Sequence, residues 1–352
     1  MVEGIMTNVR GSLVGSFPFS ELLVQKVLDY KYGRSAVGPV QEQFNTELTD
    51  LITLQEESLF PVVTTGSFGV EDLLRPFTTT LETFTNSYQK IGDVPVTRWH
   101  NTNTFYRRPR LTQPLPEDPH VITQALHTLS GKSSYSHDAV EGKRKRLILP
   151  GPYTFASLVD LPLGRADSPY DSFESWLEQV GYYLGKELAT AGGYEEVQLD
   201  EPALVWRRVP HDHRKSIVEA YKNIRGSVPD QKIIVHTYFG DANKVANLLL
   251  SLPVDGLGFD LRSTNLTHLA GLDLTGKVVQ LGLVDSQNYI PNGDGQVIKE
   301  NIPFLSSLVL SVQNLGASEV VVTPTTSLEY LPRPVAVEKV KTIAAIIQEV
   351  LK

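Results

Sequence analysis

The fold is decided by the stretch Val197-Gln198-Leu199-Asp200-Glu201-Pro202-Ala203-Leu204. Its alternating start predicts a short strand, and Pro202 ends that strand because proline cannot donate a hydrogen bond to a sheet. Asp200 and Glu201 therefore stand at the carboxyl end of a strand. In an α/β barrel that edge carries the chemistry. A solvated turn would have the same local sequence, so this stretch alone leaves both interpretations open.

Seven further segments have the apolar, β-branched composition of strands, and most are separated by segments with helical spacing. With the first stretch, the predicted strands cover 11–18, 60–66, 146–150, 196–200, 232–238, 257–261, 278–285 and 319–324. The predicted helices cover 21–29, 40–59, 173–191, 213–224, 241–250, 303–315 and 335–351. This order predicts an α/β fold, a single (β/α)₈ TIM barrel over residues 1–352, with an insertion around 94–142 after the second strand. We find no linker that would divide the chain into two domains.

The insertion begins with a segment, 95–109, that alternates polar and aromatic residues. It predicts an extended hairpin or a loop, with a turn at 101–103, projecting from the top of the barrel. The segment is locally basic, with Arg98, Arg107 and Arg108. An anionic substrate tail and simple coverage of the barrel mouth are both compatible with that charge. One short helix is expected farther on, around 121–129.

Composition limits the classes of function. The chain has 352 residues and a formal net charge of −8, and no basic stripe is available for nucleic acid. The basic run 143–146 is interpreted as a solvated loop that leads into a strand. The absence of cysteine excludes disulfides and thiolate-ligated metal sites. Neither a signal peptide nor an apolar run of about 20 residues is visible, so we expect a soluble protein without a membrane partner, located in the cytoplasm.

Five blocks along the chain carry a family resemblance, and they span about residues 13 to 333. They are Leu13–Pro18, Leu149–Phe155, Val197–Leu204, Ile234–Gly240 and Leu281–Asp285. In this order they resemble the cobalamin-independent methionine synthase family. The resemblance implies a TIM barrel that transfers a methyl group from 5-methyltetrahydrofolate, or another methyl donor, to homocysteine. Full-length members have two such barrels, whereas this chain has the length of one and resembles the amino-terminal barrel at 97–106.

The resemblance also raises the question of zinc, which the family's catalytic barrel binds through a histidine, two cysteines and a glutamate. The matching histidine is His236, but Tyr238 stands at the first cysteine position and the second falls within 324–326. The acidic ligand position falls near Asp260. Because a catalytic zinc normally keeps three protein ligands, zinc is doubtful as a cofactor here. His236 and Asp260 are the catalytic candidates, although a histidine at a strand end is more often a hydrogen-bonded core residue.

The residues that hold the amino acid substrate in the family match Ser16, Glu71 and Asp200, and Glu201 is their neighbouring candidate. Carboxylates at a barrel mouth suit an ammonium group, and the amide of a serine suits a carboxylate. Glu71 has an alternative place in the first turn of a helix. Leu158 stands near the position where the family stacks the pterin on a tryptophan. No cofactor-binding residue is therefore assigned, and 5-methyltetrahydrofolate stays a possible donor.

Three functions remain open at this point. The first is a methyltransferase that makes methionine, with homocysteine and a folate as small-molecule substrates. The second is a non-catalytic, amino-terminal-type partner subunit, which binds folate or docks on a separate zinc-bearing catalytic barrel. The third is another activity on the same barrel, because a fold does not determine a function.

Overall fold

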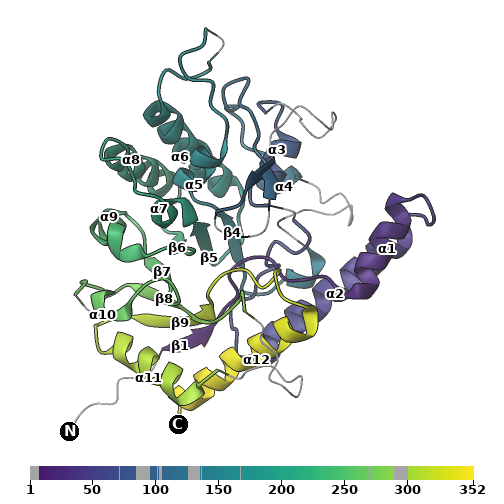
Figure 1. Cartoon of the computed structure of the whole chain (residues 1–352), viewed down its shortest axis with the longest axis vertical. Coiled ribbons are helices and arrows are strands. Elements are labelled where there is room, and N and C mark those ends of the chain that lie inside the picture. Colours follow the sequence, from purple (N-terminus) through teal and green to yellow (C-terminus); the bar gives the residue numbers. More distant parts are fainter. Residues whose placement is uncertain are drawn as a thin grey trace.

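A curled, parallel, seven-stranded sheet forms the centre of the molecule in the computed structural model (Figure 1), with the order β1-β9-β8-β7-β6-β5-β4. The structure describes residues 8–70, 72–84, 96–100, 102, 105–125, 135, 137–166, 168–269, 271–288 and 300–352. The strands of this sheet are β1 (Val9–Gly11), β4 (Arg146–Pro150), β5 (Glu196–Asp200), β6 (Lys232–Thr237), β7 (Gly256–Asp260), β8 (Val278–Val284) and β9 (Glu319–Pro324). The prediction of an α/β fold is confirmed.

The strands are buried on both faces, which is typical of a parallel sheet covered by helices. Every residue of β4, β5, β7 and β8 is buried. The longer helices are α1 (Glu21–Lys31), α2 (Gly38–Glu57), α6 (Phe173–Thr190), α8 (His213–Ser227), α11 (Ile302–Gln313) and α12 (Arg333–Val350). The shorter ones are α3 (Arg75–Thr80), α4 (Val121–Gln124), α5 (Pro152–Leu158), α7 (Pro202–Trp206), α9 (Ala246–Ser251) and α10 (Leu266–Leu269). In Figure 1, α6 and α8 flank the sheet on one side, and α1 projects from the body on the other.

The segment 60–66 lies between the two edge strands, β1 and β4. Val63 donates its N–H to the carbonyl of Arg144 at 2.9 Å and accepts from the N–H of Arg146 at 2.8 Å, which forms a single parallel bridge. On the other side, the N–H of Gly11 reaches the carbonyl of Leu59 at 3.5 Å. The sequence predicts a second strand over 60–66, but the structure has only one isolated β-bridge there, between Val63 and Lys145. The predicted first strand is also displaced, since β1 ends at Gly11 and the segment that follows is a loop.

The segment predicted as an insertion, around 94–142, contains two short strands in its described residues. β2 (Val96–Arg98) and β3 (Phe105–Arg107) pair antiparallel, with Arg98 opposite Phe105. Residues 101 and 103 of the expected turn lie outside the described residues, as do 126–130. The helix expected over 121–129 is described as α4, which begins where predicted and ends at Gln124. No helix within the described ranges is both long and apolar enough to span a membrane.

A buried ion-pair cluster, formed by Arg10, Arg146, Glu196 and Glu319, joins the amino-terminal ends of the strands. Arg146 Nε donates to Glu196 at 2.6 Å, and Arg10 contacts Glu196 at 2.7 Å and Glu319 at 2.8 Å. Burial opposes the ionisation of Glu196, but Arg146 and Arg10 hold its pKa below the usual value. The last residue of the basic run 143–146 is therefore a core residue. Both carboxylates of the cluster have a guanidinium partner, which offsets the high cost of an unpaired buried charge.

Candidate functional site

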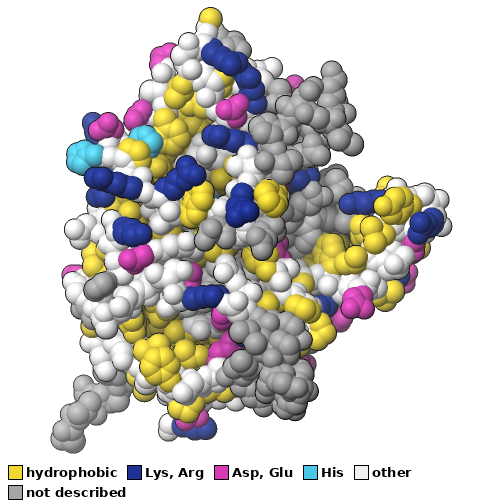
Figure 2. All heavy atoms as spheres, in the orientation of Figure 1, with side chains coloured by type: hydrophobic (Ala, Val, Ile, Leu, Met, Phe, Trp, Pro, Cys, Tyr) yellow, Lys and Arg dark blue, Asp and Glu magenta, His cyan; other side chains and the backbone are white. Residues whose placement is uncertain are grey.

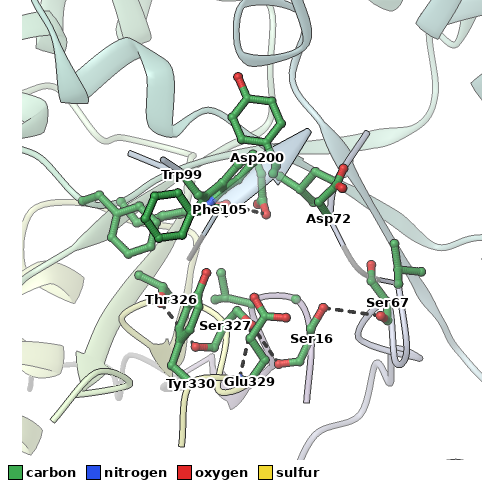
Figure 3. Close-up of a pocket in the computed structure, with 17 residues that line it drawn as sticks. Ser16, Ser67, Asp72, Trp99, Phe105, Asp200, Thr326, Ser327, Glu329 and Tyr330 are labelled. Carbon is green, nitrogen blue, oxygen red and sulfur yellow. Dashed lines mark hydrogen bonds between the residues drawn. The ribbon is translucent and has the colours of Figure 1, made fainter. Parts of the chain in front are cut away.

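A cavity of about 280 Å³ opens at the carboxyl edge of the sheet, and we call it the Asp200 cavity (Figure 3). Asp200 is the last residue of β5, Tyr238 directly follows β6, and Thr326 follows β9 by two residues. The carboxyl ends of parallel strands meet at one edge, so these residues converge although they are far apart in sequence. The lining residues are Val14, Gly15, Ser16, Ser67, Val70, Asp72, Leu73, Trp99, Phe105, Tyr106, Asp200, Tyr238, Phe239, Thr326, Ser327, Glu329 and Tyr330.

Two loops from opposite ends of the chain form one wall of the cavity. The carbonyl of Ser16 accepts from the hydroxyl of Ser327 at 2.9 Å and from the N–H of Leu328 at 3.1 Å. Figure 3 shows Ser16, Ser327 and Glu329 together on this wall, with Asp200 and Asp72 across the cavity. The loop that follows β1 is thus held by the loop that follows β9, which is the neighbouring strand in the sheet.

Asp200 is buried and held by two donors. Gln198 Nε2 donates to Oδ1 at 2.7 Å and the Tyr238 hydroxyl donates to Oδ2 at 3.2 Å. Burial raises the pKa of Asp200 to about 7, and the two hydrogen bonds oppose that rise because they stabilise the carboxylate. The side chain can therefore change charge close to neutral pH.

Behind Asp200, a chain of hydrogen bonds continues into the core. Gln198 Oε1 accepts from Arg146 Nη1 at 2.9 Å and from Gln280 Nε2 at 3.1 Å. Arg146 belongs to the ion-pair cluster at the amino-terminal ends of the strands. The cavity carboxylate is consequently fixed by a polar network that crosses the inside of the sheet, and its position is set before any ligand binds.

Ser16 also lies where the sequence predicts. Its hydroxyl donates to the carbonyl of Ser67 at 3.3 Å, and both residues line the cavity. Glu71 lies outside the described residues. The next residue, Asp72, lines the cavity and accepts from the N–H of Leu74 at 3.0 Å. Sequence reasoning did not single out Asp72, although the loop that carries it follows the predicted second strand.

Glu201 is directed away from the cavity and holds the first turn of α5. Its carboxylate accepts from the N–H groups of Tyr153 at 2.9 Å and Thr154 at 2.7 Å, and also from the hydroxyls of Thr154 at 2.6 Å and Tyr221 at 3.1 Å. Burial raises its pKa to about 7, against these hydrogen bonds. A methyl group on Gly151 would lie 2.4 Å from the Glu201 carboxyl, so glycine is required beside it.

His236 is fully buried and does not line the cavity. Its Nδ1 is 2.9 Å from Gln280 Nε2, so that nitrogen accepts and the ring belongs to the polar network. Burial lowers its pKa to about 3, against a backbone hydrogen bond with Thr325, and the imidazole is neutral at neutral pH. A Cβ on Gly258 would lie 2.1 Å from this ring.

Asp260 likewise does not line the cavity. It accepts from the N–H of Arg262 and the hydroxyl of Ser263, both at 2.9 Å, and so fixes the loop after β7. Of the six candidate residues, the structure brings Ser16 and Asp200 together, separates Glu201, His236 and Asp260 from them, and leaves Glu71 undescribed.

The residues at the expected zinc positions do not fit zinc. The Tyr238 hydroxyl donates to Asp200, and burial raises its pKa well above the usual range, so the phenol is neutral. Within the described ranges, no three His, Asp or Glu side chains are grouped so that they could hold a metal ion.

The most prominent feature that the sequence did not predict is the aromatic wall of the cavity. Trp99, Phe105 and Tyr106 come from the hairpin, whose aromatic alternation was visible in the sequence without indicating a direction. The other aromatic lining residues are Tyr238, Phe239 and Tyr330. The guanidinium of Arg98 lies 5.7 Å from the centre of the Phe105 ring, and Arg108 donates to the carbonyl of Val159 at 3.0 Å.

A larger groove of about 1010 Å³ adjoins the cavity, between α1 and the beginning of α12. Ser16, Val70 and Glu329 line both the groove and the cavity, so the two hollows are neighbours. Leu22 and Val24 of α1 line it and are exposed, and Figure 2 shows hydrophobic side chains gathered on this projecting helix.

The family model described as the N-terminal domain of cobalamin-independent synthase matches residues 83–300. The 5-methyltetrahydropteroyltriglutamate–homocysteine methyltransferase of Streptococcus thermophilus is 29% identical over 254 residues, which cover 70% of this chain and 31% of that protein. The enzyme of the same name from Nitrobacter winogradskyi is 30% identical over 249 residues, covering 69% and 29%.

A solved structure described as a vitamin-B12-independent methionine synthase from Listeria monocytogenes has a TM-score of 0.63 and 15% sequence identity, and the match covers 98% of this chain and 99% of that one. At this identity the likeness shows the fold alone. The chain spans about a third of the length of the two curated relatives.

Proposed function

Because this chain belongs to the cobalamin-independent synthase N-terminal domain family, we propose that it takes part in methionine biosynthesis, by methyl transfer to homocysteine. The relatives named above carry this activity in their names, with a folate-type methyl donor. The observation that carries the proposal is Asp200, a carboxylate fixed in a small cavity at the carboxyl edge of the strands. A biosynthetic protein of this kind would work in the cytoplasm.

In this proposal, Asp200 and Ser16 contact the substrate, and Glu71 is the third candidate contact. An ammonium group suits the carboxylate of Asp200, while a substrate carboxylate suits the hydroxyls and amides of the opposite wall. Glu201, His236 and Asp260 act as positioning residues. Their hydrogen bonds hold α5, the polar network and the loop after β7, respectively.

The complete architecture is also part of the proposal. We infer an eight-stranded barrel formed by residues 1–352 as one domain, with the insertion around 94–142. The bridge at Val63 supports this, because it places the segment 60–66 beside β4, with Leu59 hydrogen-bonded to β1.

A second function, the partner subunit, is favoured by the donor set at the expected zinc positions. Because Tyr238 stands at one of these positions, the chain would bind folate or dock on a separate barrel, and that barrel would carry the zinc that activates the thiol. The groove beside the cavity offers room for a folate-type donor or for contact with such a barrel.

Isothermal titration calorimetry with L-homocysteine tests the first of these functions, the methyltransferase. We expect binding that weakens about tenfold or more in Asp200→Asn, since a hydrogen bond to a charged group contributes about 1.5–3 kcal/mol. Asp230→Asn, an exposed aspartate in a turn, is the matched control. A wild-type chain that does not bind homocysteine would refute the proposal.

Methionine formation then separates the two functions. The chain is incubated with homocysteine and 5-methyltetrahydropteroyltriglutamate, alone and with a separately purified zinc-bearing barrel. Methionine from the chain alone supports the enzyme. Methionine that requires the added barrel, and exceeds what that barrel makes by itself, supports the partner subunit.

A further inference from the structure

Glu329 belongs to both hollows of the site. It lines the Asp200 cavity together with Ser16, and both residues also line the groove between α1 and α12. In Figure 3, Glu329 lies on the same wall as Ser16 and Ser327, with Asp200 across the cavity. A side chain in this place can contact a ligand in the cavity and a second ligand in the groove.

The backbone of Glu329 is held by its loop, while its side chain is exposed. Its N–H donates to Ser327 Oγ at 3.4 Å, and the same hydroxyl donates to the carbonyl of Ser16 at 2.9 Å. The side chain is open to solvent. Because a glutamate side chain rotates about several single bonds, its carboxylate can turn from one hollow toward the other without a change in the loop.

Three carboxylates of described residues line the cavity, and two of them have partners that define other roles. Asp72 accepts from the N–H of Leu74 at 3.0 Å and pairs with Arg75 at 3.5 Å, so its charge is partly balanced. Asp200 accepts from two side chains and receives the ammonium group of the substrate in the proposed function. Among the described residues, no lysine or arginine forms an ion pair with Glu329.

The thiol of homocysteine needs a base in this site. A thiol is a strong nucleophile only after it loses its proton, and a cysteine-like thiol is mostly protonated at neutral pH. His236 and Asp260 do not line the cavity. The other titratable lining residues that the structure describes are tyrosines, whose phenols are protonated at neutral pH as well. Glu329 is therefore the described lining residue best placed to accept the thiol proton.

We propose that Glu329 is a catalytic residue that carries the proton of the homocysteine thiol to the methyl donor. The inference rests on the proposed function in its methyltransferase form, with homocysteine in the cavity and a folate-type donor in the groove. Glu329 acts first as the general base toward the thiol and then as the general acid toward the amine that loses the methyl group.

The transfer balances without a further reactant. The S–H bond of homocysteine breaks, and its proton passes to a carboxylate oxygen of Glu329. The bond between the methyl carbon and the donor nitrogen breaks with its electron pair on nitrogen, and the methyl carbon bonds to the sulfur. As this happens the nitrogen takes the proton from Glu329, which returns to the carboxylate form.

Steady-state kinetics of methionine formation from homocysteine and 5-methyltetrahydropteroyltriglutamate test this role. Glu329→Gln should lower kcat about 100-fold or more, since general acid–base catalysis contributes about 10²–10⁴-fold, and should change the KM for homocysteine by less than about threefold. Glu329→Asp keeps a carboxylate on a shorter side chain and should recover part of the loss. The matched control is Glu338→Gln, an exposed residue of α12 that lines neither hollow, and its kcat should equal that of the wild type.

Methyl iodide as the donor separates the two proton transfers. Iodide leaves without a proton, so this reaction needs only the base, and the chain has no cysteine that would compete with homocysteine. The wild type should accelerate the methylation of bound homocysteine over the reaction in buffer, and Glu329→Gln should lose at least about tenfold of that rate. At saturating homocysteine, the wild-type rate should rise with pH as Glu329 ionises, and this rise should be absent in Glu329→Gln.

Each outcome bears on a different claim. Equal kcat values in the wild type and Glu329→Gln, or a change confined to KM, would overturn the inference and leave the proposed function in place. A chain that binds homocysteine but does not accelerate its methylation by either donor would also overturn it, and the partner subunit would remain. A chain that binds no homocysteine would refute the methyltransferase itself, and the inference would fall with it.

Discussion

The hydroxyl of Tyr238 offers a sharp test of the site, because it can be removed without changing the ring. In the folded protein this hydroxyl donates to Asp200 Oδ2 at 3.2 Å and stabilises the ionised carboxylate. A hydrogen bond to a charged group contributes about 1.5–3 kcal/mol, and the length of this one favours the lower limit. Since 1.36 kcal/mol corresponds to one pH unit, Tyr238→Phe should raise the pKa of Asp200, now about 7, by about one pH unit.

The assay is a ¹³C NMR titration of protein labelled at the aspartate carboxyl carbon. Asp200→Asn identifies the resonance by its loss, and Tyr182→Phe on the exposed face of α6 is the matched control. The affinity for L-homocysteine should follow the same titration, rising with pH as Asp200 ionises, with its midpoint moved upward in Tyr238→Phe. A resonance of Asp200 that titrates identically in wild type and Tyr238→Phe would refute the hydrogen bond as the cause.

The other predictions concern stability. Glu201→Ala should lower the free energy of unfolding by about 3 kcal/mol or more, measured by urea denaturation, because it leaves several buried donors unpaired; affinity for cavity ligands should stay unchanged. Arg146→Met should cost about 3–5 kcal/mol in the same assay, because Glu196 then loses a buried partner; a neutral result would contradict the buried pair. Gly151→Ala should destabilise the fold by about 1–3 kcal/mol through its clash with Glu201, seen as a lower thermal midpoint. Folding raises the pKa of Glu201 from 4.5 to about 7, so the protonated side chain stabilises the fold. This stabilisation is complete below about pH 4 and is lost as the pH rises through 7. The free energy of unfolding should therefore decline less between these pH values in Glu201→Gln than in the wild type.

Periodicity predicted the elements that form the sheet and its helices, because buried strands and amphipathic helices have strong patterns. The strand at 196–200 and the helix that starts at Phe173 are found where predicted. The segment 60–66 was not predictable in the same way. Its β-branched composition is that of a strand, but the structure gives it a single bridge at Val63, because pairing depends on neighbours that are distant in sequence.

The site was predictable to the extent that strand ends define it. Asp200 follows from its place at the end of a strand, and both Asp200 and Ser16 follow from the matched blocks. Glu201, which looks equivalent in the sequence, differs because the N–H groups of a helix that begins at residue 152 surround it. Glu329 lines the cavity because the loop after β9 lies against the loop after β1. No local sequence pattern predicts a contact between these two distant loops.

The pairing of β1 with β9 has a consequence for how the protein is made. Val9 pairs with Val320 and Gly11 with Val322, so the first strand finds its neighbour only when more than 300 further residues have left the ribosome. At about 5–20 residues per second, the nascent chain waits roughly 15–60 s with one edge of β1 unpaired. Such distant pairing slows folding, and a free strand edge attracts other chains. Deletion of the last strand and helix should therefore leave a chain that aggregates during synthesis, even though every residue of the first strand is present.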